Sequence, residues 1–347
     1  MKLIEKDITI NRMNDPLFKW MSKSNIAYLD IETTGLSPKS SAVILMGLVK
    51  AFNKETTAKT TLHQCLCSSP VEEQSLLEWT LKNLEGIDII VTYNGAKFDI
   101  PFINKRMDKY GLPNISKKIY HIDILQLVRN YSHLKDILPN LKQKTIEQFL
   151  KRDSNRLDQI SGADSVVMYD AYVETGSKQL EETILLHNHD DIFQLSTLTQ
   201  ISNHCNYHQF LCHKGIPLRL QTSSNQDTFA YIKPNLKGTK LIIEGYCQSP
   251  ANYLAFFTPS LPFQAKINDC QLNFELDLQK IDKYLAIDLT PFEENFSSIS
   301  KQWLSKQHLY SNGYFVLGTQ HDTNYYQLAV VSSLITKEIF KIIDAGF

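Results

Sequence analysis

The chain has 347 residues, with 36 Lys and Arg against 37 Asp and Glu, and a hydrophobic share of 43%. This composition is that of a soluble globular protein, and the length favours two domains over a single core. A formal charge of −1 excludes a protein coated all over by nucleic acid, although an enzyme that grips a few phosphates needs no basic excess.

The sequence shows neither a membrane span nor a targeting pattern. The longest strongly apolar run, residues 42–49, is too short to cross a bilayer, and the charged residues among the first ten predict that no signal peptide is present. The cysteines show no CxxC pair and no zinc-ribbon spacing, so we expect reduced, mostly buried thiols in a cytoplasmic protein without membrane contact. Cys65 and Cys67, which alternate on a predicted strand, are expected in the core rather than on a metal.

Residues 1–24 form a polar lead-in, whose Phe18 and Trp20 are expected to pack on the first domain. From residue 25 onward, short apolar runs alternate with segments of helical periodicity. The predicted strands cover 25–32, 42–52, 60–67, 87–92 and 119–122, and the predicted helices cover 71–84, 98–110, 124–131, 138–150, 166–174 and 178–204. Three strands, a helix and then two strand–helix units predict an α/β domain, with a mixed sheet that has helices on both faces.

The pattern changes after about residue 208, which predicts a domain boundary between residues 205 and 220. We therefore divide the chain into the lead-in, a first domain at 25–208 and a smaller α+β domain of unknown role at 209–347. In the latter, turn-bounded aromatic runs predict strands at 240–246, 252–257 and 313–318, with helices at 298–308 and 334–343. Its aromatic residues either stack bases or form a core; they include Tyr231, Tyr246, Phe256, Phe257, Tyr314, Phe315, Tyr325 and Tyr326.

The first candidate site is Asp30-Ile31-Glu32, which follows a short apolar run and precedes a turn at residues 33–35. A spacing of two on a strand places both carboxylates on the same face. Buried side by side they repel each other and lose hydration, and a hard cation such as Mg²⁺ or Mn²⁺ offsets that cost. On its own, the pair is also compatible with a solvated strand end.

The second candidate site begins where a predicted strand ends at Thr92. Asn94 and Gly95 make a turn, and Asp99 falls in the first turn of the next helix, where the helix dipole favours its ionised form. On its own, Asp99 is compatible with an ordinary N-terminal acid of a helix. Gly95 is a turn residue or lets a substrate backbone approach closely, and Phe98 is a core residue or a base-stacking platform.

The third candidate site lies on the long helix predicted at 178–204. His187 and Asp191 are four residues apart, so they share one face of that helix. An imidazole and a carboxylate presented together are what a metal site with a general base requires, although an ordinary surface pair has the same spacing. His189 and Asp190 point elsewhere and are expected on a solvated face.

The three sites read DIETTG from residue 30, YNGAKFDIPF from residue 93 and HNHDD from residue 187. In this order they resemble the three exonuclease motifs of the DnaQ-like (DEDD) 3′–5′ exonucleases of the ribonuclease H-like superfamily. The YprB-type group of this superfamily is the most similar, because LKQKTIEQFL (141–150), ISGAD (160–164) and YDAYVETG (169–176) also fit it. The resemblance covers roughly residues 25–205 and implies a ribonuclease H-like mixed five-stranded sheet flanked by helices.

The resemblance implies a role for each residue at a matching position. Asp30 and Glu32 hold the metals, with Asp30 as the bridging ligand. Asp99 adds a ligand through water or from outside the inner coordination sphere, and Asp191 closes the site. His187 stands where relatives place the Tyr or His that deprotonates the attacking water, and its spacing to Asp191 is that of the Tyr-type relatives.

The implied activity is a two-metal-ion 3′–5′ exonuclease acting on single-stranded DNA or RNA ends, with Mg²⁺ or Mn²⁺ as cofactor. Two ions about 4 Å apart clamp the scissile phosphate, one activating water and the other stabilising the leaving 3′ oxygen. Asn188 also fits the family pattern, with no role beyond hydrogen bonding, and Asp123 is expected to cap the helix that follows it. The residues expected to contact the substrate are Thr33, Asn94, Gly95 and Phe98.

We expect no Arg to balance the four carboxylates, so that a polyanion approaches only when metal is bound. Residues 102–156 carry twelve Lys and Arg against five acids, a local charge of +7 that suits phosphate contacts or is scattered over solvated helix faces. Two other hypotheses stay open. One is a nucleic-acid-binding module with a vestigial catalytic site, and the other is a structure-specific endonuclease on the same scaffold.

Overall fold

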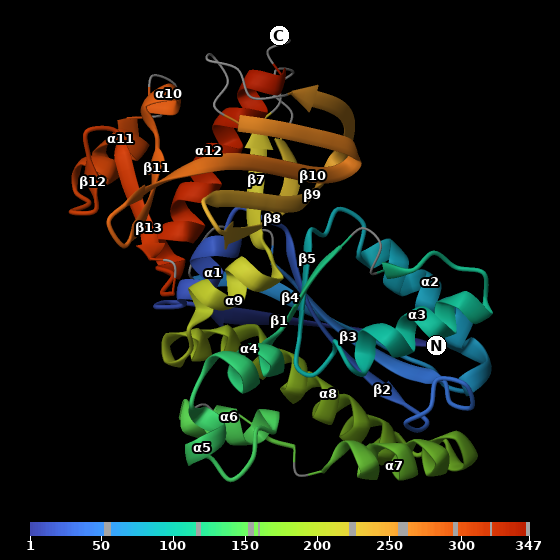
Figure 1. The fold of residues 1–347 in the computed structure, drawn as a ribbon. Helices are drawn as coiled ribbons and strands as arrows, with labels where there is room; N and C mark the ends of the chain where they lie inside the picture. The colour runs from blue at the N-terminus through green and yellow to red at the C-terminus, as the bar shows by residue number, and fades with distance from the viewer. Residues whose placement is uncertain are drawn as a thin grey trace. The chain divides into compact units, whose positions relative to one another are not determined.

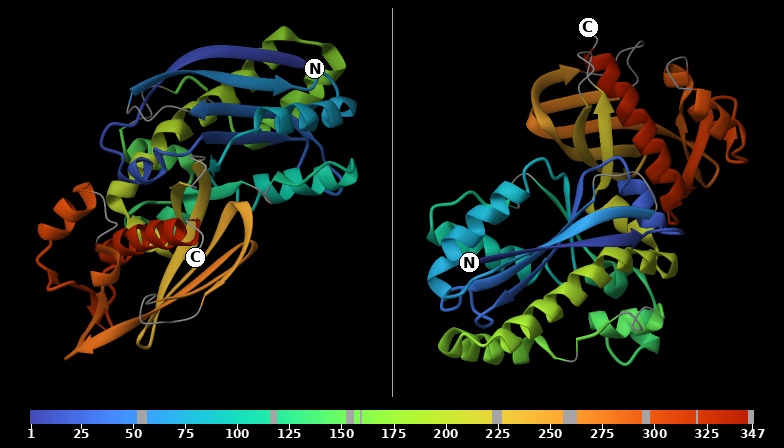
Figure 2. Two further views of the ribbon diagram at one scale, coloured as in Figure 1. Left: turned by 90° about the horizontal axis from the view of Figure 1, so that it is seen from above. Right: turned by 180° about the vertical axis from the view of Figure 1, so that it is seen from behind.

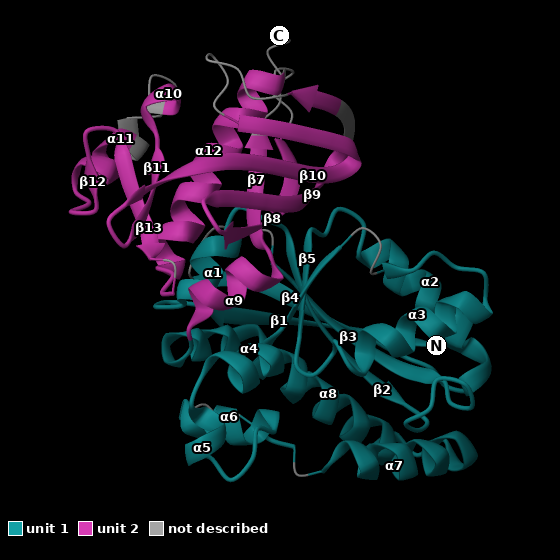
Figure 3. Cartoon of the chain, viewed as in Figure 1, with its two compact units in different colours: residues 1–205 teal, residues 206–347 magenta. Residues whose placement is uncertain are grey.

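The structure is a computed structural model that describes residues 1–51, 57–115, 119–151, 156–158, 160–221, 227–255, 263–293, 298–319 and 321–344. The chain divides into two compact units, Met1–Cys205 and Asn206–Phe347 (Figure 3). Each unit has a sheet of its own and is described by itself. Within the described ranges, no helix has both the length and the apolar character that a membrane crossing requires.

A mixed six-stranded sheet forms the centre of the first unit, in the order β1-β4-β3-β2-β5-β6 (Figure 1). Its strands are β1 (Lys2–Asn11), β2 (Ile26–Thr33), β3 (Val43–Ala51), β4 (Thr57–Leu66), β5 (Ile89–Thr92) and β6 (Tyr120–Asp123). Neighbours from β1 to β2 pair antiparallel, whereas β5 pairs parallel with both β2 and β6. Almost every residue of β2 and β3 is buried, because these central strands are covered on both faces.

The α/β fold with a mixed sheet is confirmed, but the sheet has six strands where five were expected. The additional strand is β1, which lies in the predicted lead-in and pairs along its whole length with β4. Only Ile8 and Ile10 of this polar edge strand are buried, so it lacks a clear apolar alternation. The lead-in also contains α1 (Pro16–Met21), which is capped by Asp15 and buries Phe18.

Helices cover both faces of this sheet (Figures 1 and 2). The hydrophobic cluster on one face includes α2 (Glu73–Asn83) and α3 (Asp99–Lys109), and the cluster on the other includes α7 (Gly162–Thr175) and α8 (Lys178–Leu198). The other helical segments are α4 (Ile124–Tyr131), α5 (Leu134–Ile137), α6 (Gln143–Phe149), η1 (Pro70–Glu72) and η4 (Thr199–His204). The helix expected at 138–150 is wrong in its first part, because Pro139 favours an extended Leu138, and α6 begins only at Gln143.

The second unit contains a seven-stranded antiparallel sheet in the order β12-β13-β11-β10-β9-β8-β7. Its strands are β7 (Ile216–Gln221), β8 (Asp227–Lys237), β9 (Lys240–Ala255), β10 (Phe263–Ile281), β11 (Tyr284–Asp288), β12 (Tyr310–Ser311) and β13 (Tyr314–Thr319). Its helices are α9 (Tyr207–Lys214), α10 (Thr290–Glu293), α11 (Ser298–Ser305) and α12 (Tyr325–Asp344). The expected strands at 240–246 and 313–318 correspond to β9 and β13, whereas residues 256–257 of the third lie outside the described residues.

The cysteines occupy the environments that the sequence predicted. All six thiols are free, and Cys65, Cys67, Cys212 and Cys247 are buried. Cys65 and Cys67 belong to the hydrophobic cluster that joins the sheet to α2 and α3. Burial raises the pKa of both thiols to about 12, so they stay protonated at neutral pH and behave as small apolar side chains.

Candidate active site

Asp30 and Glu32 project from one face of β2, as their spacing predicted. Ile31, which lies between them, points to the opposite face and joins the cluster with α2 and α3. On the Asp30 side, the Asn188 side-chain amide donates a hydrogen bond to Asp30 Oδ2 at 2.8 Å, and His187 Nε2 lies 3.6 Å from Glu32 Oε1. The pair therefore faces α8 inside the unit rather than a solvated strand end.

Asp99 approaches the same place from the first turn of α3. Because β5 is the parallel neighbour of β2, the carboxyl ends of both strands lie at one edge of the sheet, and α3 starts shortly after β5. Asp99 is only 5% exposed, and a backbone hydrogen bond from Ile31 favours its charged form. The acid at the helix start is thus directed at β2 and not at solvent.

His187 and Asp191 lie one turn apart on the side of α8 that faces β2. His187 is 3% exposed, and its Nε2 lies 3.6 Å from Asp191 Oδ2. Together with Glu32, these side chains offer three ligand atoms that all lie within 4.8 Å of one another. The two residues therefore belong to a cluster with β2 and do not form an ordinary surface pair.

Asp30, Glu32 and Asp99 share a buried environment that disfavours their charged forms. Burial, followed by the charges of Asp191, Asp99 and Glu32, holds the pKa of Asp30 well above its ordinary value. Burial raises the pKa of Glu32 to about 7 against the opposing effect of His187. Burial also raises the pKa of Asp99 to about 7. Such a cluster is stabilised by protons or by cations, and at neutral pH cations are the more effective partner.

A cavity of about 720 Å³ opens over this cluster. Asp30, Glu32, His187 and Asp191 line it, whereas Asp99 is absent from its described lining. The structure thus places three of the four predicted acids and the histidine at the cavity wall. Asp99 is near enough for its charge to raise the pKa of Asp30.

The four predicted substrate-contact residues fall into two groups. Thr33 and Phe98 line the cavity, and the Phe98 ring also packs against Phe102 with 5.5 Å between centroids. Asn94 and Gly95 are not among the described lining residues. A Cβ at Gly95 would lie 2.2 Å from Thr92 Oγ1, so a close approach within the chain itself accounts for this glycine.

Asp123 caps α4, as predicted, and also orders the turn before α3. Its carboxylate accepts hydrogen bonds from the backbone N–H groups of Leu125 and Gln126 at the start of α4. It also accepts from the N–H groups of Asn94 and Ala96. Because Asn94 has a φ of 68°, this carboxylate fixes a strained turn that leads directly to Asp99.

Arg156 corrects the expectation that no Arg balances the acidic pocket. Its guanidinium Nη2 lies 2.5 Å from Asp191 Oδ1 and 2.8 Å from Glu147 Oε1, while Nη1 lies 2.6 Å from Asp158 Oδ1. Glu147 and Asp158 have side-chain exposures of 0% and 1%. One guanidinium therefore contacts three carboxylates and leaves Asp191 Oδ2 as the oxygen that faces His187.

Asp190 corrects a second expectation, because it does not lie on a solvated face. It is 2% exposed, and its Oδ2 accepts hydrogen bonds from the backbone N–H groups of Leu157 and Asp158, at 2.5 and 2.9 Å. Asp190 thereby ties the segment 156–158 to α8. His189 is half-buried and stacks on Phe193, with 6.2 Å between ring centroids.

Asn188, for which the sequence suggested no role beyond hydrogen bonding, links the Asp30 carboxylate on β2 to the Gln64 side chain on β4. Gln64 Nε2 donates to Asn188 Oδ1 at 2.9 Å, which turns the Asn188 amide nitrogen toward Asp30 Oδ2. Asn188 is 0% exposed and Gln64 is 3% exposed, so water does not compete for these bonds. The chain Gln64–Asn188–Asp30 fixes the orientation of the carboxylate that the resemblance assigns as the bridging ligand.

Gly47 leaves room for this hydrogen-bond chain, so we expect Gly47→Ala to disturb it. A Cβ at position 47 would lie 2.4 Å from Asn188 Oδ1 and displace that side chain. We expect a loss of about 1–3 kcal/mol in the free energy of unfolding and roughly 10–100-fold weaker Mn²⁺ binding, measured by urea unfolding and calorimetry. The control is Gly162→Ala, because a Cβ at Gly162 meets nothing within 4 Å. Equal behaviour of the two variants would contradict this role of Gly47.

The basic segment 102–156 is only partly available to phosphates. Arg106 and Arg156 are engaged in buried ion pairs. Lys142 and Lys144 line the cavity, although Lys144 Nζ also lies 3.0 Å from Asp158 Oδ2. The segment's positive charge at the site therefore comes chiefly from these two lysines. Lys117, Lys118 and Arg152 lie outside the described residues.

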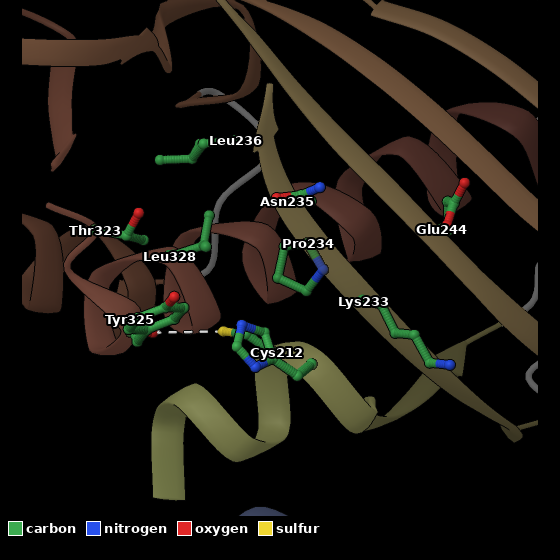
Figure 4. Close-up of a pocket in the computed structure, with 10 residues that line it drawn as sticks. Cys212, Lys233, Pro234, Asn235, Leu236, Glu244, Thr323, Tyr325 and Leu328 are labelled. Atoms are coloured by element: carbon green, nitrogen blue, oxygen red, sulfur yellow. Dashed lines mark hydrogen bonds between the residues drawn. The ribbon is translucent and has the colours of Figure 1, made fainter. Parts of the chain in front are cut away.

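A second cavity, of about 400 Å³, lies within the C-terminal unit between α9, β8 and α12 (Figure 4). At one end, Cys212 Sγ donates a hydrogen bond to the backbone carbonyl of Tyr325 at 3.7 Å. Lys233 and Glu244, which are paired across β8 and β9, also line it. Among its described lining residues Glu244 is the one acid, so this cavity does not repeat the carboxylate cluster of the first. A role of this unit in positioning substrate stays a prediction.

The donor set of the first cavity fits divalent cations. Asp30, Glu32 and Asp191 line one cavity, the carboxyl groups of Asp30 and Glu32 are poorly solvated, and hard cations prefer such oxygen ligands. Partners outside the cluster orient two of these ligands, namely Asn188 at Asp30 and Arg156 at Asp191. This support is typical of built metal sites.

The sequence profile of the RNase_H superfamily matches residues 27–203, just over half of the chain. The chain belongs to the RNase_H superfamily. The match begins in β2 and ends in η4, so it includes all four acids, His187 and the sheet that carries them. The first unit thus has the ribonuclease H-like fold that the sequence predicted.

The individual proteins that this chain resembles are distant from it. A PolC-type DNA polymerase III from Ureaplasma parvum serovar 3 is 28% identical over 134 residues, which are 33% of this chain and 9% of the polymerase. The family B DNA polymerase from the archaeon Pyrobaculum calidifontis matches with 13% identity and a TM-score of 0.42, over 55% of this chain and 25% of that one. Exonuclease I matches with 12% identity and a TM-score of 0.34, over 63% and 56% of the two chains. This chain therefore spans less than a tenth of its PolC-type relative, and the superfamily match carries the assignment.

Proposed function

We propose that this RNase_H superfamily protein is a metal-dependent nuclease that removes nucleotides from the 3′ end of single-stranded DNA or RNA. The observation that carries the proposal is the convergence of Asp30, Glu32, Asp99 and Asp191 from β2, α3 and α8 on one buried cluster at a cavity. The three motifs shared with DnaQ-like exonucleases, and with their YprB-type group, support attack from the 3′ end. The PolC-type relative is a DNA polymerase, which favours a nucleic-acid substrate.

Asp30, Glu32 and Asp191 are the residues that hold two divalent ions, Mg²⁺ or Mn²⁺, with Asp99 supporting Asp30. When bound, such ions neutralise the scissile phosphate and lower the pKa of water so that it attacks near neutral pH. The chain's own contribution is to fix the ligands in place. Asn188 orients Asp30, while Arg156 holds one oxygen of Asp191 and leaves the other facing the cavity.

Lys142 and Lys144 are the side chains at the cavity wall that attract the nucleic-acid backbone. Lys142 is the N-cap residue of α6, and Lys144 lies in the first turn of that helix. Phe98 and Thr33 complete the wall near the reacting end. A stacked base on Phe98 fits the position of this ring, which is only partly covered by the core.

The direct test incubates the purified full chain and Mn²⁺ with labelled DNA and RNA of matched sequence. We expect 5′-labelled linear single strands to shorten stepwise from the 3′ end, and circular single strands to resist. Cleavage of circles would show an endonuclease instead. Tight binding without turnover on any substrate, with or without metal, would show a binding module and contradict the proposal.

The raised pKa values of Glu32 and Asp99 predict that metal binding strengthens as the pH rises. Glu32 must lose its proton before it binds a cation, and a charged Asp99 nearby strengthens the attraction for that cation. Both carboxyls have pKa values of about 7, so protons compete with the cation below about pH 7. Between pH 6 and 8, the Mn²⁺ dissociation constant is expected to fall as the pH rises. For each proton that the metal displaces, the fall is up to about tenfold per pH unit. Calorimetry in two buffers of different ionisation enthalpy measures the proton release. A dissociation constant equal at both pH values would contradict the assignment.

The raised pKa values of Glu32 and Asp99 also determine how the free energy of unfolding of the metal-free protein changes with pH. The folded state keeps protons on Glu32 and Asp99 that the unfolded chain releases near its ordinary values of 4.5 and 3.8. The metal-free protein is therefore expected to lose stability as the pH rises from about 4 through about 7. Saturating Mn²⁺ reverses this loss, because it replaces the protons and binds the folded state.

A further inference from the structure

His187 is held in one orientation by a carboxylate outside the four acids. Its Nδ1 lies 2.7 Å from Asp158 Oδ2, and both side chains are almost completely buried, with exposures of 4% and 1%. Asp158 is itself held by Arg156 and Lys144, at 2.6 and 3.0 Å. With Arg156 and Lys144 beside it, the Asp158 carboxylate accepts a hydrogen bond from Nδ1–H, and Nε2 is the ring nitrogen on the side of Glu32 and Asp191.

His187 Nε2 makes no hydrogen bond to any residue that the structure describes. It lies 3.6 Å from both Glu32 Oε1 and Asp191 Oδ2, beyond hydrogen-bond distance. Ligand atoms about 2.1 Å from a common ion are separated by roughly 3.0–3.5 Å at adjacent coordination positions. The Nε2 atom is therefore close to ligand spacing from both carboxylates, and one ion would bind all three atoms, which lie within 4.8 Å of one another, once the side chains draw together around it.

The surroundings of these atoms have the form that proteins use for histidine ligands. A metal-bound imidazole almost always donates its other N–H group to a carboxylate or carbonyl, as His187 donates to Asp158. Asp191 is likewise restrained, because Arg156 holds its Oδ1 and leaves Oδ2 in the cluster. A general base can accept a proton from water without two carboxylates next to it. A metal ion needs several ligand atoms close together, as Glu32, His187 and Asp191 provide.

We propose that His187 is a metal ligand, and that Glu32, His187 and Asp191 together bind one transition-metal cation, such as Mn²⁺ or Co²⁺, in preference to Mg²⁺. An imidazole nitrogen favours transition metals, while Mg²⁺ prefers oxygen and water. The proposal rests on the proposed function only in taking the acidic cluster as a cation site. It replaces the general-base role that the resemblance implies for His187, and it makes Asp158 a positioning residue for that ligand.

Proton NMR of the full chain loaded with Co²⁺ tests this assignment without any activity measurement. A Co²⁺-bound imidazole whose Nδ1–H is shielded by Asp158 gives a strongly shifted resonance that is visible in H₂O and lost in D₂O. We expect one such resonance in the unaltered protein, none in His187→Gln, and an unchanged one in the control His133→Gln. The His133 side chain is 97% exposed and is not among the described residues that line the cavity.

Metal affinities measured by calorimetry give a second readout. We expect His187→Gln to weaken Co²⁺ binding at least about tenfold while Mg²⁺ binding changes less, and Asp158→Asn to weaken Co²⁺ binding roughly 10–100-fold. Circular dichroism verifies that each variant folds. If His187→Gln does not fold, the Co²⁺ affinity of Asp158→Asn still tests the inference. A shifted resonance that persists in His187→Gln, or equal Co²⁺ affinities of all variants, would overturn the inference. The nuclease proposal would not be affected by that result, because the hydrolysis rate of Asp30→Asn tests it separately.

Discussion

Asp30→Asn is expected to lower the rate of 3′-end hydrolysis by on the order of 10³-fold, because stabilisation of the reacting phosphate by metal is worth several kcal/mol. The change is nearly isosteric, and an Asn side-chain oxygen at position 30 still accepts the hydrogen bond from Asn188. It removes one negative charge from a site whose charges repel each other. Metal-free Asp30→Asn is therefore expected to unfold at a higher temperature than the unaltered protein at pH 8.

These opposite effects on activity and stability distinguish a lost ligand from a damaged fold. The matched control is Asp136→Asn, since Asp136 has a side-chain exposure of 58% and lies away from the cluster. It should keep full activity and an unchanged unfolding temperature. Activity of Asp30→Asn within a few-fold of the control, with Mn²⁺ present, would show that Asp30 does not hold a catalytic ion.

Arg106→Met is expected to lower the free energy of unfolding by about 3–5 kcal/mol, because it leaves a buried carboxylate without its counter-ion. Arg106 Nε and Nη2 donate to Glu73 at 2.8 and 2.5 Å, and Glu73 has no exposed side-chain surface. Glu73 also accepts the backbone N–H group of Val43 and the Tyr110 hydroxyl. The pair thus joins α2, α3 and β3 on the face of the sheet opposite α8.

Urea unfolding of single and double variants distinguishes two effects on stability. One is the loss of the ion pair, and the other is the cost of leaving the Glu73 charge buried without a partner. In the double variant Arg106→Met with Glu73→Gln, the charge is gone and an amide oxygen still accepts from Val43. This variant should be more stable than Arg106→Met alone. Lys105→Met, at the exposed neighbouring position, should change stability by no more than about 0.5 kcal/mol. A single variant as stable as this control would contradict the role assigned to the pair.

Much of the first unit's fold was predictable because its signals are local. The period of two placed Asp30 and Glu32 on one face of β2, and the period of 3.6 placed His187 and Asp191 on one face of α8. Buried apolar runs located β2 to β6. By contrast, β1 is a polar edge strand whose position depends on pairing with β4, and such pairing leaves little trace in composition.

The parts of the candidate site that sequence reasoning missed depend on contacts between distant segments. Arg156 and Asp158 lie in an irregular segment without periodicity, and only folding brings them to Asp191 and His187. Gln64 is a polar residue within a strand, and nothing in the local sequence pattern indicates its hydrogen bond to Asn188. A weak signal was present in the basic segment 102–156. Its positive charge predicted either phosphate contacts or solvated helix faces, whereas part of it is paired with buried acids.

The most direct measurement of the central claim is a crystal structure of the full chain grown with millimolar Mn²⁺, with anomalous data collected near the manganese edge. The account predicts anomalous peaks inside the cavity, bounded by Asp30, Glu32 and Asp191, at roughly 2.0–2.3 Å from their oxygens. It also predicts one peak within bonding distance of His187 Nε2. Manganese at other surface sites together with an empty cavity would contradict the claim that these acids form a cation site.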